Sequence, residues 1–313
     1  MMKKQSANSI PHALMLCLTA LIWGFAFVAQ SVGAGHVGTF TVLAVRTWIA
    51  AAALVPVLLV HERRRTDADG IPGGGRERRF LYQLAGGALC GAALFLGSAA
   101  QQAGIAGTTT AKAGFIPALY VIIVPVISIL AGRSPDRKLW LCVFLALAGL
   151  YLLCMKSGQG GLNGSDLILL LCAFLFSLQI MAVSFCLHFT DGVRLAVMQT
   201  VVTAVLSSIC VLLFEHPTAE AVRAALPALL YAGLFSSAVG FTLQIIAQER
   251  LEPTVASLIM CHESVFSAVG GWLLLGQALN TREIAGCVLM FAAIVLSQIP
   301  SRNESGAEGA GAA

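Results

Sequence analysis

Charged side chains are scarce in this chain. Asp, Glu, Lys and Arg make up 11% of its 313 residues, whereas apolar residues make up 58%. Because a soluble domain carries roughly 25% charged residues, this composition excludes an ordinary soluble protein and predicts an integral membrane protein. The net charge of +4 comes from short segments between long uncharged ones, which favours a role in membrane orientation over nucleic-acid binding.

The sequence also lacks the patterns of common metal and nucleotide sites. Its nine cysteines fall inside apolar runs without the close pairing of a zinc site, so we expect them to be small buried hydrophobic residues. The Arg-rich segment 61–79 contains glycines, but it lacks the strand and lysine context of a phosphate loop. We therefore predict no metal, no cofactor and no nucleic-acid partner.

Long apolar stretches dominate what is present. A helix needs about 20 apolar residues to cross a bilayer, and on that measure the chain contains ten predicted spans. These spans are His12–Val32, Thr39–Val60, Phe80–Gln101, Thr108–Ala131, Leu139–Met155, Asp166–Leu187, Gly192–Phe214, Leu226–Ala247, Thr254–Leu275 and Thr281–Ile299. The connections are too short to fold as domains, and the low-complexity tail 301–313 is predicted to be disordered.

The distribution of Lys and Arg predicts the orientation. If the N-terminus is cytoplasmic, only Lys156, Arg223 and Arg282 fall in the outer segments. The inner segments then hold Lys3, Lys4, Arg63, Arg64, Arg65, Arg76, Arg78, Arg79, Arg133, Arg137, Lys138, Arg194, Arg250 and Arg302. Because positive charge collects on the cytoplasmic side, both termini of this multi-pass protein are predicted to be cytoplasmic.

The two halves of the chain repeat one another weakly. A shift of 153 residues lays Leu14–Leu59 on Leu167–Leu212, and a shift of 145 pairs Thr109 with Thr254 and Cys142 with Cys287. The repeated unit holds five spans, and an odd number forces the copies to insert with opposite orientation. We therefore predict an all-α fold of ten helices as a 5+5 inverted repeat, with units 1–156 and 157–300.

Three stretches of this sequence resemble a known family. They are LTALIWGFAFVAQ, AGFIPALYVIIVPVISILAGRSPDRKLWLCVFLALAGLYLL and VASLIMCHESVFSAVGGWLLLGQALNTREIAGCVLMFAAIVL, and they are similar to the EamA domains of the drug/metabolite transporter superfamily. The resemblance implies two tandem EamA units in a ten-helix carrier of a bacterial or archaeal cytoplasmic membrane that exports small organic metabolites. Relatives often end the ninth span with Gly–Glu. Here Gly276–Gln277 stands there, so a role for that acid cannot be transferred.

Glu263 lies near the centre of the ninth predicted span, about 15 Å of helix from its cytoplasmic start. A carboxylate at that depth is costly and is therefore a candidate functional group. It could bind a coupling proton or attract an amine-bearing substrate, or it could be a structural residue tied to a neighbouring helix. The adjacent His262 points about 100° away around the helix, so it is either a packing residue or a substrate ligand.

Two basic residues also lie within predicted spans. Arg46 begins about 10 Å below the outer end of the second span, at a depth similar to that of Glu263. It needs an anion, either Glu263 or a substrate carboxylate or phosphate, unless its long side chain reaches the outer interface. The repeat places Gln199 at the equivalent position. Lys112 lies one turn into the fourth span, where reaching the surface is favoured over anion capture.

Amides and one tryptophan complete the candidate site. Trp23 is too deep for the interfacial aromatic belt, so it either stacks on a substrate or packs in the core. The amides either bind substrate or join helices. They are Gln30, Gln101, Gln179, Gln244 and Gln248. Pro117 and Pro125 are expected to kink the fourth span, and Gly270–Gly271 to interrupt the ninth.

These features predict a secondary active or facilitative transporter that works by alternating access and binds a small molecule, with or without a coupling proton. One alternative is a membrane-embedded enzyme for lipid-linked substrates, although the aspartates all lie at span ends and leave no buried acidic pair for catalysis. The other is a channel or scramblase, whose flux would not saturate. Both a monomer and a homodimer fit the sequence.

Overall fold

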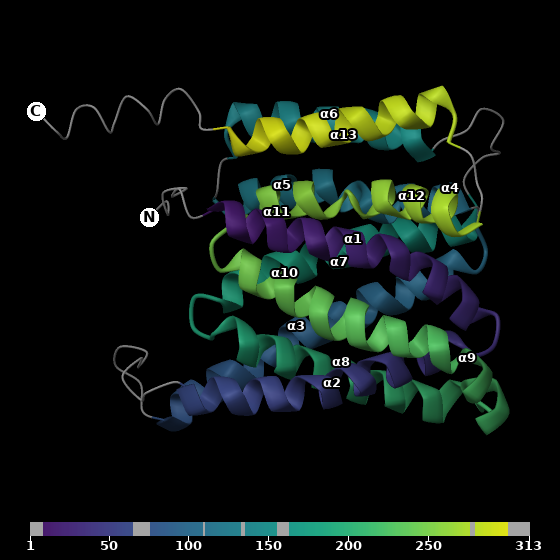
Figure 1. The fold of residues 1–313 in the computed structure, drawn as a ribbon. Coiled ribbons are helices and arrows are strands. Elements are labelled where there is room, and N and C mark those ends of the chain that lie inside the picture. Colours follow the sequence, from purple (N-terminus) through teal and green to yellow (C-terminus); the bar gives the residue numbers. More distant parts are fainter. Residues whose placement is uncertain are drawn as a thin grey trace, which may run out of the picture.

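The computed structural model describes residues 9–64, 76–108, 110–132, 135–154, 163–275 and 279–299. All regular secondary structure within these ranges is helical, which confirms the predicted fold class (Figure 1). Nine helical segments of the described chain are long and apolar enough to cross a membrane. The ninth predicted span is divided into two shorter helices, which together with those nine segments complete the 5+5 arrangement.

The first repeat runs from α1 to α6 and the second from α7 to α13 (Figure 1). The first contains α1 (Ser9–Ala34), α2 (Thr39–Arg64), α3 (Arg76–Ile105), α4 (Thr110–Phe115), the 3-10 helix η1 (Pro117–Leu119), α5 (Tyr120–Leu130) and α6 (Arg137–Cys154). The second contains α7 (Gly164–Cys186), α8 (Gly192–Phe214), α9 (Ala219–Tyr231), the π-helix η2 (Ala232–Gly240), α10 (Phe241–Gln248), α11 (Pro253–Met260), α12 (Glu263–Leu275) and α13 (Thr281–Gln298).

The helices form one bundle in which two pairs of equivalent helices lie side by side. Helices α6 and α13 lie together on one side of the bundle, and α2 lies beside α8 on the other (Figure 1). A Cβ on Gly149 of α6 would lie 2.6 Å from the Gly286 carbonyl oxygen of α13, and a Cβ on Gly286 would lie 2.5 Å from that of Gly149. These glycines therefore allow the two backbones to touch.

The pairing of α2 with α8 is closed at both ends by residues that the repeat makes equivalent. Glu62, near the end of α2, accepts hydrogen bonds from Arg194 Nε (2.6 Å) and Nη2 (2.5 Å). The shift of 153 relates Glu62 to Glu215, which follows α8, and Arg194 to Thr41. Glu215 accepts from the backbone N–H groups of Phe40 (2.9 Å) and Thr41 (2.8 Å) and so caps the start of α2. The carboxylate of Glu62 thus forms an ion pair at one end of the α2–α8 pair, whereas the equivalent carboxylate of Glu215 binds uncharged groups at the other end.

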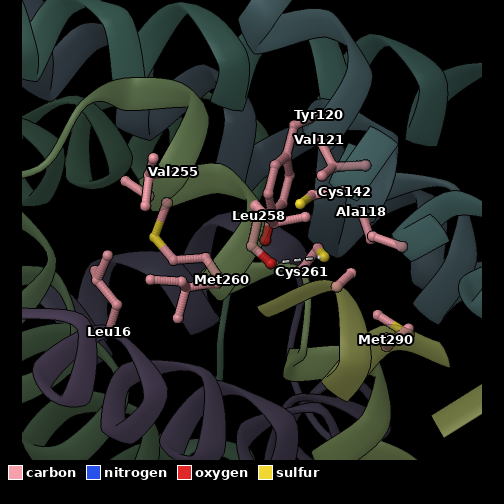
Figure 2. Close-up of a cluster of buried hydrophobic side chains, with 14 of the residues drawn as sticks. Leu16, Ala118, Tyr120, Val121, Cys142, Val255, Leu258, Met260, Cys261 and Met290 are labelled. Atoms are coloured by element: carbon pink, nitrogen blue, oxygen red, sulfur yellow. Dashed lines mark hydrogen bonds between the residues drawn. The ribbon is translucent and has the colours of Figure 1, made fainter. Parts of the chain in front are cut away.

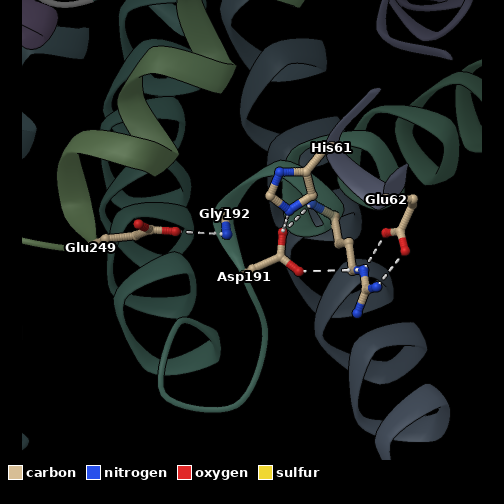
Figure 3. Close-up of polar contacts among 6 residues, drawn as sticks. His61, Glu62, Asp191, Gly192 and Glu249 are labelled. Atoms are coloured by element: carbon tan, nitrogen blue, oxygen red, sulfur yellow. Dashed lines mark hydrogen bonds and ion pairs between the residues drawn. The ribbon is translucent and has the colours of Figure 1, made fainter. Parts of the chain in front are cut away.

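Further contacts reinforce the ionic end. His61 Nε2 lies 3.3 Å from a carboxylate oxygen of Asp191, which also caps the first turn of α8. Gly192 donates its backbone N–H to Glu249 at 2.8 Å, which ties α8 to the end of α10 (Figure 3). This end of the bundle is therefore held by contacts among α2, α8 and α10.

The largest buried apolar cluster surrounds the fourth and ninth spans. Every residue of α11 is buried, and Leu258, Met260 and Cys261 belong to one buried cluster with Tyr120 of α5 and Met290 of α13 (Figure 2). A helix that is apolar on all sides belongs in the centre of a bundle. The centre is thus built where the two shorter, interrupted spans meet.

The structure differs from the sequence expectations at two points and agrees with them at Pro117. Gly270–Gly271 does not interrupt the ninth span, because α12 continues through Gly270 and the break lies at Cys261–His262 instead. Pro117 interrupts the fourth span as expected, and Pro125 lies inside α5. The eighth span begins earlier than predicted, at Ala219, because the Thr218 hydroxyl caps its first turn by accepting from Ala221 N–H.

Three predictions lie outside the described residues. They concern the side chain of Lys112, the Gly276–Gln277 pair and the tail 301–313.

Candidate functional site

A narrow cavity of about 40 Å³ lies where the two repeats meet. Both halves of the chain contribute to its wall, through α1, α2, α3 and α5 on one side and α7, η2, α10, α11 and α12 on the other. Its polar lining consists of Gln30, Arg46, Gln101, Tyr120, Gln179, Ser236, Gln244 and Glu263, and its apolar lining of Trp23, Phe27, Phe176, Ile180, Phe241 and Met260.

The break between α11 and α12 places Glu263 at this cavity. The backbone N–H of His262 bonds the Ile259 carbonyl at 3.2 Å, in place of the Leu258 carbonyl that a regular helix would use. The Leu258 carbonyl instead accepts from Cys261 Sγ, drawn in Figure 2, and lies 3.1 Å from His262 Nδ1. The two side chains replace the lost backbone partner, and Glu263 becomes the first residue of α12.

The break in the fourth span occupies the equivalent position of the first repeat. The shift of 145 relates Pro117 of η1 to His262. Proline has no backbone N–H and clashes with the preceding turn, so the regular helix ends before it. Tyr120 then becomes the first residue of α5. The two interrupted spans are therefore broken at matching places by different residues.

Two hydrogen bonds join the breaks directly. Ser264 Oγ donates to the Gly114 carbonyl of α4 at 2.9 Å, and the Tyr120 hydroxyl donates to Glu263 Oε1 at 3.2 Å. Gly24 of α1 brings a third helix against this point, since a Cβ there would lie 2.8 Å from the Glu263 carbonyl oxygen. Glu263 is thus held between α1 and α5 with only 6% of its surface exposed.

Arg46 enters the same cavity from α2 and is only 3% exposed. Among the described residues no ion pair or hydrogen bond to Arg46 is found, and its Nε is buried without a partner. The suggested pairing of Arg46 with Glu263 is therefore not formed. The alternative in which Arg46 reaches the outer interface does not fit either, because the side chain lines the cavity.

Trp23 is fixed at the cavity wall by the π-helix η2. Its indole Nε1 donates to the Ser236 carbonyl at 3.1 Å, and its ring lies 4.9 Å from that of Phe241. Thr19, one turn earlier in α1, donates to the Gly240 carbonyl at 3.4 Å. A π-helix bonds each carbonyl to the N–H five residues on, and the second lone pair of a carbonyl oxygen can accept from a side chain as well. Trp23 consequently both lines the cavity and joins the two repeats.

A chain of amides extends from the cavity into the second repeat. Gln244 Nε2 donates to Gln179 Oε1 (3.1 Å) and to Gln248 Oε1 (3.2 Å), and Gln179 Nε2 donates to Gln199 Oε1 (3.1 Å). Gln248 in turn donates to the Ile180 carbonyl. Gln179 and Gln244 line the cavity, whereas Gln199 and Gln248 lie behind them and support their orientation.

The structure thus brings together most of the predicted site residues. Trp23, Arg46, Gln179 and Glu263 share the cavity wall. Gln199 lies behind the wall, and His262 is fully buried with its ring 5.5 Å from that of Phe291 in α13. The geometry of His262 therefore favours the packing role over the ligand role.

Sequence reasoning missed the partner of Glu263, Tyr120, as well as Ser236 and the aromatic residues Phe27, Phe176 and Phe241. The repeat could have identified Tyr120. Tyr120 follows Ala118, the repeat counterpart of Glu263, by two residues, and polar side chains next to a matching break are expected to face the same centre.

Matches are found among protein families, curated proteins and solved structures. Residues 10–155 and 163–298 each match the EamA-like transporter family. An uncharacterized transporter from Archaeoglobus fulgidus is 28% identical over 284 residues, which cover 90% of this chain and 84% of that protein. A solved protein crystal structure superimposes with a TM-score of 0.73 at 18% identity and covers 92% of this chain and 96% of the other, so it shares the fold. These matches confirm the resemblance seen in the sequence.

Proposed function

The chain belongs to the EamA-like transporter family, and from that premise we propose that it is a secondary carrier that exports a small organic compound by alternating access. The family and the apolar helices make it a multi-pass membrane transporter. The proposal adds the direction, the mechanism and the class of substrate, with the chain placed in the cytoplasmic membrane and both termini in the cytoplasm.

The observation that carries this proposal is the cavity between the repeats. Its wall combines aromatic rings with a few polar groups, the usual composition of a site for a small organic molecule. Because each repeat supplies part of the wall, a rocking movement of one repeat against the other would open the site to either side in turn.

The broken helices support a site at this place. Interrupted helices near the centre of a membrane bundle are characteristic of carrier sites, because an irregular backbone is tolerated there only beside protein or a cavity. Here both breaks adjoin the cavity, and each presents the first residue of a half-helix, Tyr120 or Glu263, to its wall. The contact between these two residues would then change when the halves move.

We assign Glu263 the role of coupling site. It lines the cavity, its carboxylate accepts a hydrogen bond from Tyr120, and no cationic partner is found among the described residues. A group in that position can take up a proton on one side and release it on the other, so export of the compound would be coupled to proton entry. The second possibility is that Glu263 binds an amine of the substrate directly.

A channel or scramblase is the second candidate function, since a central cavity alone does not distinguish it from a carrier. A lipid-processing enzyme is less well supported, because the cavity wall contains one carboxylate, Glu263, instead of an acidic pair.

The test has two stages. The first compares metabolites retained inside cells with and without the gene, which identifies an exported compound without assuming its class. The second reconstitutes the protein in liposomes and measures counterflow of that compound. We expect saturable uptake that is accelerated by unlabelled compound on the opposite side. Flux that rises linearly with concentration and shows no exchange would support a channel instead.

A further inference from the structure

Arg46 is a buried cation without a counter-ion among the described residues. Its side chain lines the cavity, and its Nε is buried without a hydrogen-bond partner. A guanidinium keeps its charge in proteins, and a buried unpaired charge is strongly unfavourable unless another group compensates it. Arg194, by contrast, is bound by Glu62 and Asp191 at the end of the bundle.

The nearby acids do not supply the missing anion. Glu263 shares the cavity but is engaged by Tyr120 and forms no ion pair with Arg46. The other buried or half-buried acids of the described chain are used at helix ends, where they cap or bridge backbone groups. They are Asp166, Asp191, Glu215, Glu249 and Glu283. An anion that satisfies Arg46 must therefore come from outside this set of residues.

Two further polar atoms in the wall lack partners. Gln30 Oε1 and Gln244 Oε1 are buried without a hydrogen-bond donor. The orientation of the Gln244 amide is fixed, because its nitrogen already donates to both Gln179 and Gln248. The residues that line the cavity therefore include one unpartnered cationic donor and two unpartnered acceptors.

From these atoms we propose that the transported compound is an organic acid whose carboxylate binds Arg46 and whose O–H or N–H group donates to the facing oxygens. This inference rests on the proposed carrier function and specifies its substrate class. A carboxylate matches the planar fork of a guanidinium, and its single charge balances Arg46. A doubly charged phosphate would leave excess negative charge beside Glu263. The rings of Trp23, Phe27 and Phe241 pack against the apolar part of the compound.

The test uses three probes that differ only in the head group: phenyllactate, phenyllactamide and the corresponding amino alcohol. Binding to the purified full-length protein is measured by thermal shift and by isothermal calorimetry. We expect wild-type protein to bind the acid in preference to the amide and the amine. The Arg46→Gln variant should weaken binding of the acid by roughly ten-fold or more, the scale of a charge-assisted hydrogen bond. Arg46→Lys should retain part of the binding, because it keeps the charge but loses the fork.

A structural role for Arg46 would give a different result. Arg46→Gln removes an uncompensated buried charge, so without ligand its melting temperature should be equal to or higher than that of wild type. If Arg46 had a structural role, Arg46→Gln would instead lower the melting temperature. Arg223→Gln, which changes an exposed arginine outside the cavity, is the matched control and should leave binding unchanged.

The inference is overturned if wild type shows no preference for the acid over its amide, or if Arg46→Gln binds the acid as tightly as wild type. It can fail independently of the carrier function. Saturable counterflow of a compound without an acidic group would remove the Arg46 assignment and leave the carrier intact. Selective binding of the acid by a protein that shows only linear flux would leave the Arg46 assignment intact and contradict the carrier function.

Discussion

The two interrupted spans have the same backbone break but different chemistry. In the first repeat the break is made by Pro117, and Ala118 and Tyr120 follow it. In the second repeat the break is capped by His262, and Glu263 stands at the position of Ala118. The break therefore belongs to the scaffold that both repeats share, whereas the ionisable group has been added to one copy only.

The same asymmetry recurs at the other charged residue of the cavity. Arg46 of α2 corresponds to Gln199 of α8, which is neutral and already bonded to Gln179. Each charge in the cavity therefore has an uncharged counterpart in the opposite repeat. In the proposed carrier, the pseudo-symmetric scaffold would supply two equivalent gates, and the asymmetric charges would distinguish one direction of movement from the other.

The largest expected effect comes from removing the carboxylate of Glu263, which lies at the break in the ninth span. Glu263→Gln keeps the shape and the ability to bond Tyr120 but cannot exchange a proton. We expect transport of the exported compound in reconstituted liposomes to fall to the level of protein-free liposomes, with normal membrane insertion. Glu252→Gln, an exposed acid at the start of α11, is the matched control and should transport normally. Proton-dependent transport that is unchanged in Glu263→Gln would remove the coupling role.

A smaller but substantial effect is expected from crowding the second break. A Cβ at Gly24 would lie 2.5 Å from Phe266 Cβ and 2.8 Å from the Glu263 carbonyl oxygen. Gly24→Ala should therefore destabilise the protein by about 1–3 kcal/mol, the usual cost of overpacking, and lower its melting temperature.

Gly114 beside the first break provides the comparison. A Cβ there would meet only Cys154 Sγ, at 3.9 Å, so Gly114→Ala should be tolerated. Equal melting temperatures for Gly24→Ala and Gly114→Ala would contradict the close packing of α1 on α12.

The cap on the second break can be tested through His262. His262→Ala should cost about 1–2 kcal/mol, because the buried Leu258 carbonyl loses one of its two side-chain partners. His262→Gln should recover part of the loss, since its amide can donate to the same carbonyl. The readout is the melting temperature in detergent.

An exposed histidine with the same local contact serves as control. His188 Nδ1 lies 2.9 Å from the Ser184 carbonyl, and because that site is open to solvent, His188→Ala should change stability little. Loss of substrate binding in His262→Ala at unchanged melting temperature would assign His262 to the ligand instead.

The smallest effect is expected at the contact between the two breaks. Tyr120→Phe removes only the hydroxyl that donates to Glu263, a bond worth about 1 kcal/mol, so the transport rate should fall by roughly five-fold without being lost. Tyr231→Phe removes a hydroxyl that donates to the Ile22 carbonyl outside the cavity wall and should affect stability alone. A complete loss of transport in Tyr120→Phe would indicate that the hydroxyl itself takes part in proton transfer.

The sequence was sufficient to predict most of the fold, because the fold follows from features that lie along the chain. Apolar length determines the spans, and the repeat determines the 5+5 arrangement. The position at which the ninth span divides was not predicted, since the sequence Met260–Cys261–His262 contains neither proline nor glycine. At the break, the side chains of Cys261 and His262 bond the Leu258 carbonyl in place of a backbone N–H, and only the three-dimensional structure shows these contacts.

The site was predicted only in part, because only some of its features follow from position along the chain. Counting residues gives the depth of Arg46 and Glu263 in the membrane, and the two side chains do face one cavity. Counting does not give the lateral separation of α2 and α12, so it suggested a direct ion pair that does not form. Tyr120, whose hydroxyl actually reaches Glu263, stands at a place where residue type alone gives no signal of function.

The most direct test of the account measures proton movement with a pH-sensitive dye trapped inside proteoliposomes. The compound found in the export screen is added outside vesicles that contain wild type or Glu263→Gln. We expect the internal pH to rise with wild type, because each molecule that enters is exchanged for a proton, and to stay constant with Glu263→Gln. An equal rise with both proteins would contradict the claim that the added carboxylate of the second repeat is the coupling site.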